Sequence, residues 1–314
     1  MMEIETLRYR FHEKYPRKIL SKIRWFIINR QKNILPFLNV IGGKFTVVDA
    51  FGSPGDTLLS TNIISAIKAK YKRLQINLIT KNPDIIKNDP NIKFINRFET
   101  YFSITFWYLN LIENKDSRTN VLFDTLNDIG INDYVYKCNV YLENDEKKWA
   151  REKISKNNKI KIAFNCRSKQ EVKNWPVENW EFLIKSLQDF EWIQLGDHTE
   201  PFIKNVVNFS GKLNRRESIS IMSVCDLFIG PDSFLAHAAN GLNLKSLVIF
   251  GGSRTIQNLG YSDNINIEDR PHCSPCWINQ DDDQKCTHKL KCLSNIKVET
   301  VKSQIITLLT PIEG

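Results

Sequence analysis

From residue 44 onward, short apolar runs rich in β-branched residues alternate along the chain with longer stretches of helical spacing. The first such unit is KFTVVDAF (44–51), DTLLSTNIISAIKAKY (56–71) and LQINLIT (74–80), which we expect to form a strand, a helix and a strand. Strands that alternate with helices in this way form parallel sheets with helices on both faces. The sequence therefore predicts an α/β fold.

A second series of the same kind begins near residue 160. We expect strands over 160–166, 191–196, 226–230 and 246–251, and helices over 177–190, 216–225 and 233–241. The charged segment LENDEKKWAREKISKNN (142–158) separates the two series and is predicted to run as an exposed helix into a linker. Because 314 residues are enough for two domains, we expect two Rossmann-like domains with a cleft between them, over residues 44–150 and 151–314.

The net charge of +9 is concentrated near the start of the chain. Residues 1–35 hold nine Lys or Arg and three Glu, mixed with apolar residues such as Trp25 and Phe26. This basic amphipathic composition suits an anionic membrane surface, and it equally suits a helix packed on the body with its cations in solvent. Residues 1–43 are therefore treated as a basic N-terminal segment. We expect a cytoplasmic protein, peripheral on the inner membrane if this segment binds lipid, because no secretory signal or membrane-spanning run is recognisable.

Three loops follow predicted strands, and the ligands of open parallel sheets bind beyond the carboxyl ends of the strands. In FGSPGD (51–56), Asp56 lies at or near a helix N-cap, and capping alone would explain it. RSKQEVKNWP (167–176) carries three cations and a hydroxyl ahead of a helix start, so it is either an anion site or a solvated basic loop. In the third loop, Asp232 and Ser233 either face a phosphate or cap the helix that follows.

Four motifs occur in order along the chain: GSPGDTLLSTNIISAIKAKY (52–71), KNWPVENW (173–180), GDHTE (196–200) and GPDSFLAHAANGLNLKSLVIFGG (230–252). At these separations they resemble the ADP-heptose:lipopolysaccharide heptosyltransferase family, glycosyltransferase family 9, over about residues 44–310. The resemblance implies the GT-B architecture, in which two Rossmann-like domains face a cleft, with the acceptor mainly on the N-terminal domain and the nucleotide sugar mainly on the C-terminal domain. It also implies an inverting transfer that needs no catalytic metal.

The resemblance assigns roles to individual residues of this chain. Asp56 matches the catalytic base, since a hydroxyl that attacks an anomeric carbon must lose its proton. Lys173 matches the cation that neutralises the donor diphosphate, which is the leaving group. Glu200 matches a carboxylate that accepts both ribose hydroxyls, and Leu213 matches an apolar residue against the nucleotide base. The other donor-binding positions are Ser168, Asp232, Ser233 and His237. Lys169, which stands where the family has a second hydroxyl, and Arg254 are candidate phosphate contacts that the family pattern does not supply.

Two departures from the family pattern affect the donor pocket. Phe234 stands where the family usually has glycine, which narrows the pocket and leaves the identity of the sugar open. Arg254 lies in GGSRT (251–255), where the family often reads Gly-Pro-Thr, and it is either a phosphate clamp or a surface cation. ADP-heptose is the expected donor, and the expected acceptor is a glycan such as lipopolysaccharide core, another surface polysaccharide or a lipid-linked sugar. The alternatives are a protein O-heptosyltransferase and a non-catalytic relative that binds sugar nucleotide.

Four of the seven cysteines form a C-x2-C-x9-C-x5-C pattern within residues 270–295. They are Cys273, Cys276, Cys286 and Cys292. Thiolates at this spacing can surround one zinc or iron ion in a structural finger, with His272 or His288 able to replace one cysteine. Two disulfides or four free thiols are the alternatives. The resemblance adds that protein-modifying heptosyltransferases carry an iron-bearing four-cysteine finger. Three further thiols are interpreted as ordinary buried side chains: Cys138, Cys166 and Cys225.

Two other functional classes are disfavoured. A zinc-finger nucleic-acid binder would gather its cations beside the finger, whereas NQDDDQ (279–284) is acidic, so no nucleic-acid partner is expected. A nicotinamide oxidoreductase would carry G-x-G-x-x-G after a strand, and no predicted strand is followed by that motif.

Overall fold

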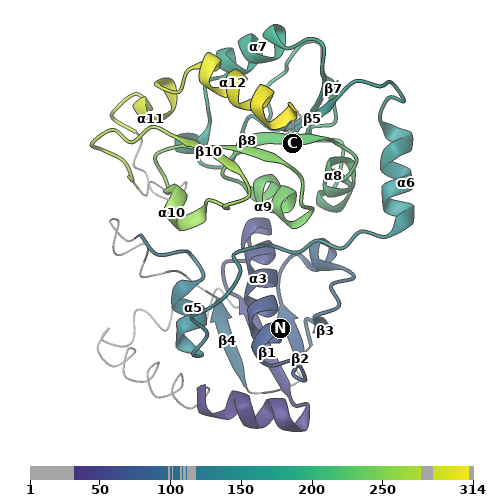
Figure 1. The fold of residues 1–314 in the computed structure, drawn as a ribbon, viewed down its shortest axis with the longest axis vertical. Coiled ribbons are helices and arrows are strands. Elements are labelled where there is room, and N and C mark those ends of the chain that lie inside the picture. The colour runs from purple at the N-terminus through teal and green to yellow at the C-terminus, as the bar shows by residue number, and fades with distance from the viewer. Residues whose placement is uncertain are drawn as a thin grey trace. The chain divides into compact units, whose positions relative to one another are not determined.

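The computed structural model describes residues 32–97, 100, 102–106, 108, 111, 118–276 and 286–310 (Figure 1). The chain divides into two compact units. Unit 1 comprises Met1–Pro83, Pro90–Tyr108 and Leu122–Val135, and unit 2 comprises Asp84–Asp89, Leu109–Val121 and Tyr136–Gly314. Most of the basic N-terminal segment, residues 1–31, lies outside the described residues, as do residues 277–285 of the cysteine segment. Of the helices that are described, none is both long and apolar enough to cross a membrane.

Unit 1 is built on a four-stranded parallel sheet with the strand order β3-β2-β1-β4. Its strands are β1 (Lys44–Asp49), β2 (Gln75–Ile79), β3 (Ile92–Ile95) and β4 (Ser103–Phe106). Residues 32–41 form a helix before β1, α3 (Pro54–Lys70) follows β1, the short turn η1 (Pro83–Ile86) follows β2, and α5 (Phe123–Asp128) follows β4. The predicted strand, helix and strand over residues 44–80 are confirmed, with Lys44 paired to Gln75 in the parallel register of β1 and β2.

Helix α3 begins where the apolar strand gives way to turn residues. Ser53 is its N-cap, its Oγ accepts the backbone N–H of Asp56, and Pro54 occupies the first turn. Lys68 and Lys70 lie in the last turn, where cations interact favourably with the helix dipole. Residues 56–64 are all buried, so this part of α3 is enclosed on every side.

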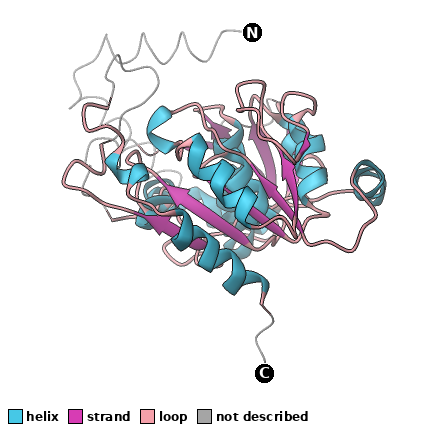
Figure 2. Cartoon of the chain, turned by 90° about the horizontal axis from the view of Figure 1, so that it is seen from above, coloured by secondary structure: helices cyan, strands magenta, loops and turns pink. Residues whose placement is uncertain are grey.

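Unit 2 is built on a six-stranded parallel sheet with the strand order β10-β9-β8-β5-β6-β7. Its strands are β5 (Lys161–Phe164), β6 (Glu191–Gln194), β7 (Val207–Asn208), β8 (Leu227–Pro231), β9 (Ser246–Phe250) and β10 (Ile265–Glu268). Its helices and turns are α6 (Asn144–Lys153), η2 (Glu171–Lys173), α7 (Val177–Ser186), α8 (Arg215–Met222), α9 (Phe234–Gly241), α10 (Ile256–Leu259), α11 (Lys291–Ser294) and α12 (Val298–Leu309). The predicted strands and helices of the second series are confirmed, and Figure 2 shows helices flanking the strands.

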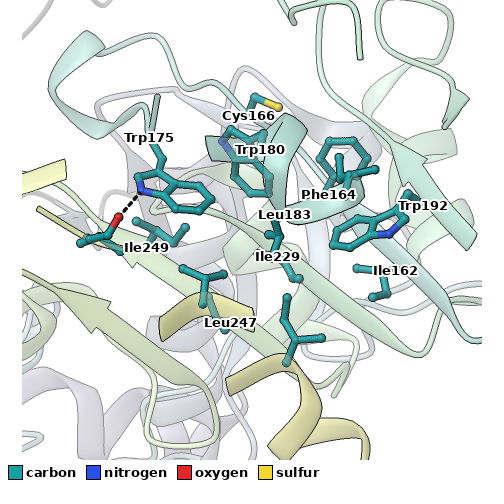
Figure 3. Close-up of a cluster of buried hydrophobic side chains, with 14 of the residues drawn as sticks. Ile162, Phe164, Cys166, Trp175, Trp180, Leu183, Trp192, Ile229, Leu247 and Ile249 are labelled. Carbon is teal, nitrogen blue, oxygen red and sulfur yellow. Dashed lines mark hydrogen bonds between the residues drawn. The ribbon is translucent and has the colours of Figure 1, made fainter. Parts of the chain in front are cut away.

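The core of unit 2 combines aliphatic side chains with four aromatic ones, Phe164, Trp175, Trp180 and Trp192 (Figure 3). Phe164 of β5 stacks on Trp180 of α7 with 5.6 Å between ring centroids, and Trp192 of β6 meets Phe164 edge-on at 5.6 Å. Trp175 donates its indole N–H to the Ile296 carbonyl over 3.1 Å. Aromatic side chains each bury about 150–250 Å² of surface, so this cluster fixes the start of α7 and with it the loop over residues 167–176.

The charged segment 142–158 contains helix α6, as predicted. Glu146 of α6 accepts two hydrogen bonds from Arg216 of α8, Nε to Oε1 at 2.7 Å and Nη2 to Oε2 at 2.9 Å. The same guanidinium donates to the backbone carbonyls of Ile85 and Tyr141. The hydrogen bond from Arg216 is the main reason that the pKa of Glu146 lies below its ordinary value. The segment is therefore fastened to α8 by a bidentate ion pair.

Candidate functional site

The sheet of unit 2 reverses its strand order between β5 and β8. From β5 the chain adds β6 and β7 on one side, and it then returns to add β8, β9 and β10 on the other. Loops that leave two neighbouring strands in opposite directions create a crevice, and this is where open parallel sheets bind ligands. The two loops at this position are residues 167–173 after β5 and the Asp232–Ser233 turn after β8. Both are loops in which the sequence predicts binding residues.

An ion pair joins the two loops. Nζ of Lys173, in η2, lies 2.7 Å from Oδ2 of Asp232 and donates to the Asp232 backbone carbonyl over 3.2 Å. Asp232 is only 3% exposed. Burial acts to raise the pKa of its carboxyl, but neighbouring positive charge, above all that of Lys173, more than offsets burial and holds the pKa below its ordinary value. Asp232 is therefore a buried, ionised carboxylate at neutral pH, with a cation fixed against it.

The GGSRT segment after β9 supports the same loop. The backbone N–H of Gly252 donates to the Val172 carbonyl over 3.1 Å, and a Cβ at Gly251 would lie 1.9 Å from that oxygen. Only glycine permits so close an approach of this strand end to the turn that carries Lys173. Arg254 is 8% exposed, and its charge contributes to the lowered pKa of Asp232. The interpretation of Arg254 as a surface cation is therefore wrong.

Helix α9 begins directly after Ser233 without a side-chain cap. Oγ of Ser233 is buried and has no hydrogen-bond partner among the described residues, and Asp232 is bonded to Lys173. Ser233 is the N-cap residue by position, but neither side chain makes a capping hydrogen bond, so capping does not explain the two side chains of this turn. The first backbone N–H groups of α9 lie at the positive end of the helix dipole, an arrangement that suits an anion. Phe234, the first residue of α9, is half-buried.

His237 of α9 is buried and neutral. Its Nδ1 lies 2.6 Å from the hydroxyl oxygen of Tyr261, and that oxygen lies 3.0 Å from Sγ of Cys138. Burial lowers the pKa of His237 to about 4, although Asp232 acts to raise it. The sequence indicates His237 but not Tyr261, and it assigns no role to Cys138 beyond packing. No motif marks the contact between Cys138 and Tyr261, because these two residues are 123 positions apart in the sequence.

Glu200 is attached to the start of the loop after β5. Its Oε2 accepts the backbone N–H of Cys166 at 2.8 Å, and its Oε1 accepts that of Arg167 at 3.1 Å. Gly196 has φ +122, and a Cβ there would lie 2.6 Å from Cγ of Glu200, so only glycine fits beside this carboxylate. Burial raises the pKa of Glu200 to about 7, against the effect of the two N–H donors. The side chains of Cys166 and Gln194 also hydrogen-bond this carboxyl.

The remaining predicted donor residues surround this loop in different ways. Oγ of Ser168 accepts the backbone N–H of Gln170 at 3.2 Å, so this side chain shapes the turn. Lys169 is exposed. Leu213 is half-buried, and Gly211, two residues before it, donates its backbone N–H to the Gly196 carbonyl over 3.0 Å. This hydrogen bond ties the segment before Leu213 to the turn before Glu200, and the contact of Ser168 with Gln170 is local.

Unit 1 shows the same reversal of strand order, between β1 and β4. Asp56 follows β1 and Tyr108 follows β4, and the Tyr108 hydroxyl donates to Oδ1 of Asp56 over 3.2 Å. The Ser53 hydroxyl donates to Oδ2 over 2.5 Å. Ser53 is the N-cap of α3 and Asp56 lies in the first turn, so the capping explanation of Asp56 is wrong. The carboxylate is 7% exposed and lies at the position of the sheet where ligands bind.

A second buried carboxylate fixes the loop that carries Asp56. Oδ1 of Asp49 accepts the backbone N–H of Gly52 at 2.8 Å, and Oδ2 accepts the hydroxyls of Thr57 at 2.7 Å and Thr80 at 3.0 Å. Nδ2 of Asn82 donates to the Gly52 carbonyl over 3.0 Å. Both sides of Gly52, which has φ +66, are thereby hydrogen-bonded. No role is predicted for Asp49 from the sequence, although an acidic residue at the end of an apolar strand is a pattern that indicates a functional side chain.

None of the seven cysteines, all of which the structure describes, forms a disulfide, so the disulfide interpretation is wrong. Cys276 and Cys292 approach each other, since a Cβ at Gly252 would lie 3.2 Å from both sulfur atoms. The pKa of Cys292 is raised to about 11, mainly by burial and to a smaller extent by the neighbouring thiols of the pattern. Within the described residues, however, no three Cys, His, Asp or Glu side chains are placed to hold a metal ion, so the predicted zinc or iron site is not supported.

The three thiols outside the pattern differ from one another. Cys138 and Cys166 are buried, as predicted, with about 1% of each exposed. Cys225 is partly exposed as a residue, but its thiol is buried as predicted: burial raises the pKa of that thiol, and its Sγ donates to the Ile221 carbonyl over 3.3 Å.

Comparison with known proteins identifies the family. The sequence matches glycosyltransferase family 9 (heptosyltransferase) over residues 117–287, more than half of the chain. No curated protein sequence matches the chain significantly. Among solved structures, the chain is similar to a glycosyl transferase family 9 protein from Veillonella parvula DSM 2008, with 15% identity, a TM-score of 0.67, and coverage of 85% of this chain and 97% of that one.

Two further structures from Escherichia coli share the fold. ADP-heptose lps heptosyltransferase II is 13% identical with a TM-score of 0.61, and the match covers 85% of this chain and 98% of that one. The iron-containing dodecameric glycosyltransferase TibC from enterotoxigenic strain H10407 is 16% identical with a TM-score of 0.66, and the match covers 84% of this chain and 75% of that one. The parallel α/β fold agrees with these neighbours, and the family match over more than half of the chain shows that it belongs to glycosyltransferase family 9 (heptosyltransferase) and is a glycosyltransferase.

Proposed function

We propose that this glycosyltransferase moves heptose from ADP-heptose to a glycan hydroxyl, with inversion at the anomeric carbon. The observation that carries the proposal is the ion pair of Lys173 and Asp232 at 2.7 Å, which lies where β5 and β8 end and α9 begins. The choice of donor is supported by two proteins of similar fold, E. coli WaaC, whose structure contains ADP, and TibC, whose structure contains ADP-D-β-D-heptose.

The leaving diphosphate is stabilised by positive charge that is already in place. Lys173 and Arg254 supply two cations near Asp232, and the first N–H groups of α9 supply aligned dipoles. Groups of this kind need no reorganisation as the anomeric bond breaks, and the loss of one costs about 10²–10³ in rate. Asp232 keeps Lys173 oriented, and its carboxylate accepts a hydrogen bond from a sugar hydroxyl.

Asp56 acts as the general base in the proposed reaction. Hydrogen bonds from Ser53 and Tyr108 reach one carboxylate oxygen each, which orients the side chain. An ionised carboxylate can take the proton of the acceptor hydroxyl as that hydroxyl attacks the anomeric carbon. The proton then resides on Asp56, and the diphosphate departs with the electrons of the broken bond.

The proposed division of labour places the acceptor on the N-terminal domain, residues 44–150, and the donor on the C-terminal domain, residues 151–314. In the latter, Glu200 accepts the ribose hydroxyls through its carboxylate oxygens, which two backbone N–H groups orient. Leu213 packs against the nucleotide base. The donor phosphates and sugar are contacted by Ser168, Lys169, Ser233 and His237.

The proposed acceptor is a lipopolysaccharide core or another surface polysaccharide, presented at a membrane. The basic composition of residues 1–35 supports attachment to an anionic inner-membrane surface, at about 1 kcal/mol for each basic residue near the lipid. Comparing the salt-sensitive binding of anionic vesicles by the full chain and by a chain lacking residues 1–35 checks this proposal. Equal binding by the two chains would contradict it.

The proposed function is tested by a binding screen with ADP-, UDP-, GDP- and TDP-sugars. We expect saturable binding, tightest for ADP-heptose, and a loss of at least about tenfold in affinity for Lys173→Ala, the equivalent of about 1.4 kcal/mol. Lys185→Ala, at an exposed lysine of α7, is the matched control and should bind like the wild type. Binding of no nucleotide sugar, or equal affinities for the two variants, would contradict the proposed donor site.

A further inference from the structure

A buried polar cluster in unit 2 contains one residue of the proposed donor site, His237, and three residues to which the proposed reaction assigns no role. These three are Tyr136, Cys138 and Tyr261. The rings of Tyr136 and Tyr261 stack with 4.6 Å between centroids and 16° between planes. The backbone N–H of Cys138 donates to Oδ1 of Asn240 over 2.9 Å, which joins the cluster to α9, the helix that also carries His237. The cluster therefore surrounds a side chain of the proposed donor site.

The contact between Tyr261 and His237 determines which imidazole nitrogen carries the proton. The Tyr261 hydroxyl lies 2.6 Å from Nδ1. A phenol O–H donates hydrogen bonds more readily than a neutral imidazole N–H, and an imidazole lone pair accepts more readily than a phenol oxygen. Tyr261 therefore donates to Nδ1, and the thiol of Cys138, 3.0 Å from the same oxygen, donates to Tyr261. Because a neutral imidazole carries one proton, that proton lies on Nε2.

The other nitrogen of His237 remains available to a ligand. None of the described residues makes a hydrogen bond to Nε2, and Nε2 is not among their fully enclosed atoms that lack a partner. His237 follows the Asp232–Ser233 turn by one turn of helix, at the end of α9 where the first N–H groups lie. An Nε2–H group here adds a hydrogen-bond donor to a site whose other groups attract anionic oxygen. The opposite tautomer would present a lone pair to that oxygen and repel it.

We propose that Tyr261 is a positioning residue of the donor site, whose hydroxyl fixes His237 as the Nε2–H tautomer so that the imidazole donates a hydrogen bond to an oxygen of the nucleotide-diphosphate sugar. The role in binding rests on the proposed function, whereas the tautomer is a property of the free protein. Tyr261 acts through His237 and does not itself touch the substrate.

Nitrogen-15 NMR of the histidine side chains in the full chain tests the tautomer directly, with the His237→Asn variant identifying the signal. We expect the wild type to show a protonated Nε2 and an unprotonated, hydrogen-bonded Nδ1 at neutral pH. Tyr261→Phe keeps the ring stacked on Tyr136 but removes the hydroxyl, so the signal should shift toward a mixture of tautomers. An Nδ1–H tautomer in the wild type, or an unchanged signal in Tyr261→Phe, would overturn the inference.

The binding arm measures affinity for ADP-heptose. Tyr261→Phe should bind about tenfold more weakly than the wild type, as expected for the loss of one hydrogen bond at about 1.4 kcal/mol. Tyr71→Phe makes the same chemical change at a buried tyrosine of unit 1 and should leave affinity unchanged. A wild type that binds, with equal affinity in Tyr261→Phe, refutes this role alone. A wild type that binds no nucleotide sugar refutes the proposed function, and the role of Tyr261 in binding with it.

Two substitutions of His237 keep the test decisive if Tyr261→Phe does not fold. The amide of glutamine reaches the position of Nε2, whereas the amide of asparagine reaches only that of Nδ1. His237→Gln should therefore retain more affinity for ADP-heptose than His237→Asn. The reverse order would contradict the requirement for a donor at Nε2.

Discussion

At the scale of single residues, Glu200 links pH to stability. Burial raises the pKa of its carboxyl to about 7, from an ordinary value of 4.5. A carboxyl whose pKa is raised by folding binds its proton more tightly in the folded state, so its contribution to stability falls as the pH rises from about 4.5 to 7. From pH 5 to pH 8, Glu200→Gln should gain about 1–2 kcal/mol of unfolding free energy relative to the wild type, after allowance for partial exposure. Chemical denaturation at the two pH values measures this gain.

The matched control for this prediction is Glu181→Gln, at an exposed glutamate of α7, whose difference from the wild type should be the same at both pH values. The proposed ribose contact adds a second readout. Donor affinity should rise with pH through about 7 in the wild type, as Glu200 ionises, and lose this dependence in Glu200→Gln. A stability difference for Glu200→Gln that does not change with pH would contradict the origin we assign to the raised pKa.

The sequence predicts site residues well when they belong to one strand, loop and helix. Lys173 and Asp232 are recognisable because each follows an apolar strand and precedes a helix, and the parallel sheet then brings the two loops together. Tyr108 and Tyr261 carry no such local signal. Each reaches the site from a distant part of the chain, so its contact depends on tertiary packing that no spacing in the sequence expresses.

At the scale of elements, segments with a clear apolar pattern are predictable even when short, as the four-residue strands β5 and β6 are. Strand β7 has two residues, too few to establish a pattern. Helix α3 begins at Pro54, two residues before the predicted start at Asp56. Ser53 followed three residues later by Asp56 has the spacing of an N-terminal capping box, which identifies Ser53 as the cap and places Asp56 in the first turn.

Elemental analysis can test directly whether the cysteine segment, residues 270–295, holds a metal ion. The spacing of Cys273, Cys276, Cys286 and Cys292 predicts one structural zinc or iron ion, whereas the described residues place no three such side chains around one point. Such an ion would order the segment and offset an entropy cost of about 1–2 kcal/mol per residue. Elemental analysis of protein purified without a metal-affinity tag should find about one ion per chain. Metal-free protein with four reactive thiols would rule the prediction out.

At the scale of the whole molecule, each unit repeats one design. Both sheets are parallel, both reverse their strand order once, and in both the candidate side chains leave the sheet at that reversal. Alternating strand and helix patterns predict such sheets, but they do not reveal the strand order, which depends on which edge each new strand joins. The family resemblance implies that one unit serves the acceptor and the other the donor.

This division of labour makes Asp56→Asn the most direct test of the account. The substitution keeps the shape of the side chain and removes the base, so turnover with ADP-heptose and a glycan acceptor should fall by about 10²–10⁴-fold while the dissociation constant for the donor stays within about twofold of the wild type. Lys173→Ala, measured in parallel, should lose both turnover and affinity for the donor. Near-normal turnover in Asp56→Asn, or a loss of donor affinity as large as that of Lys173→Ala, would contradict the separation of the base in unit 1 from the donor site in unit 2.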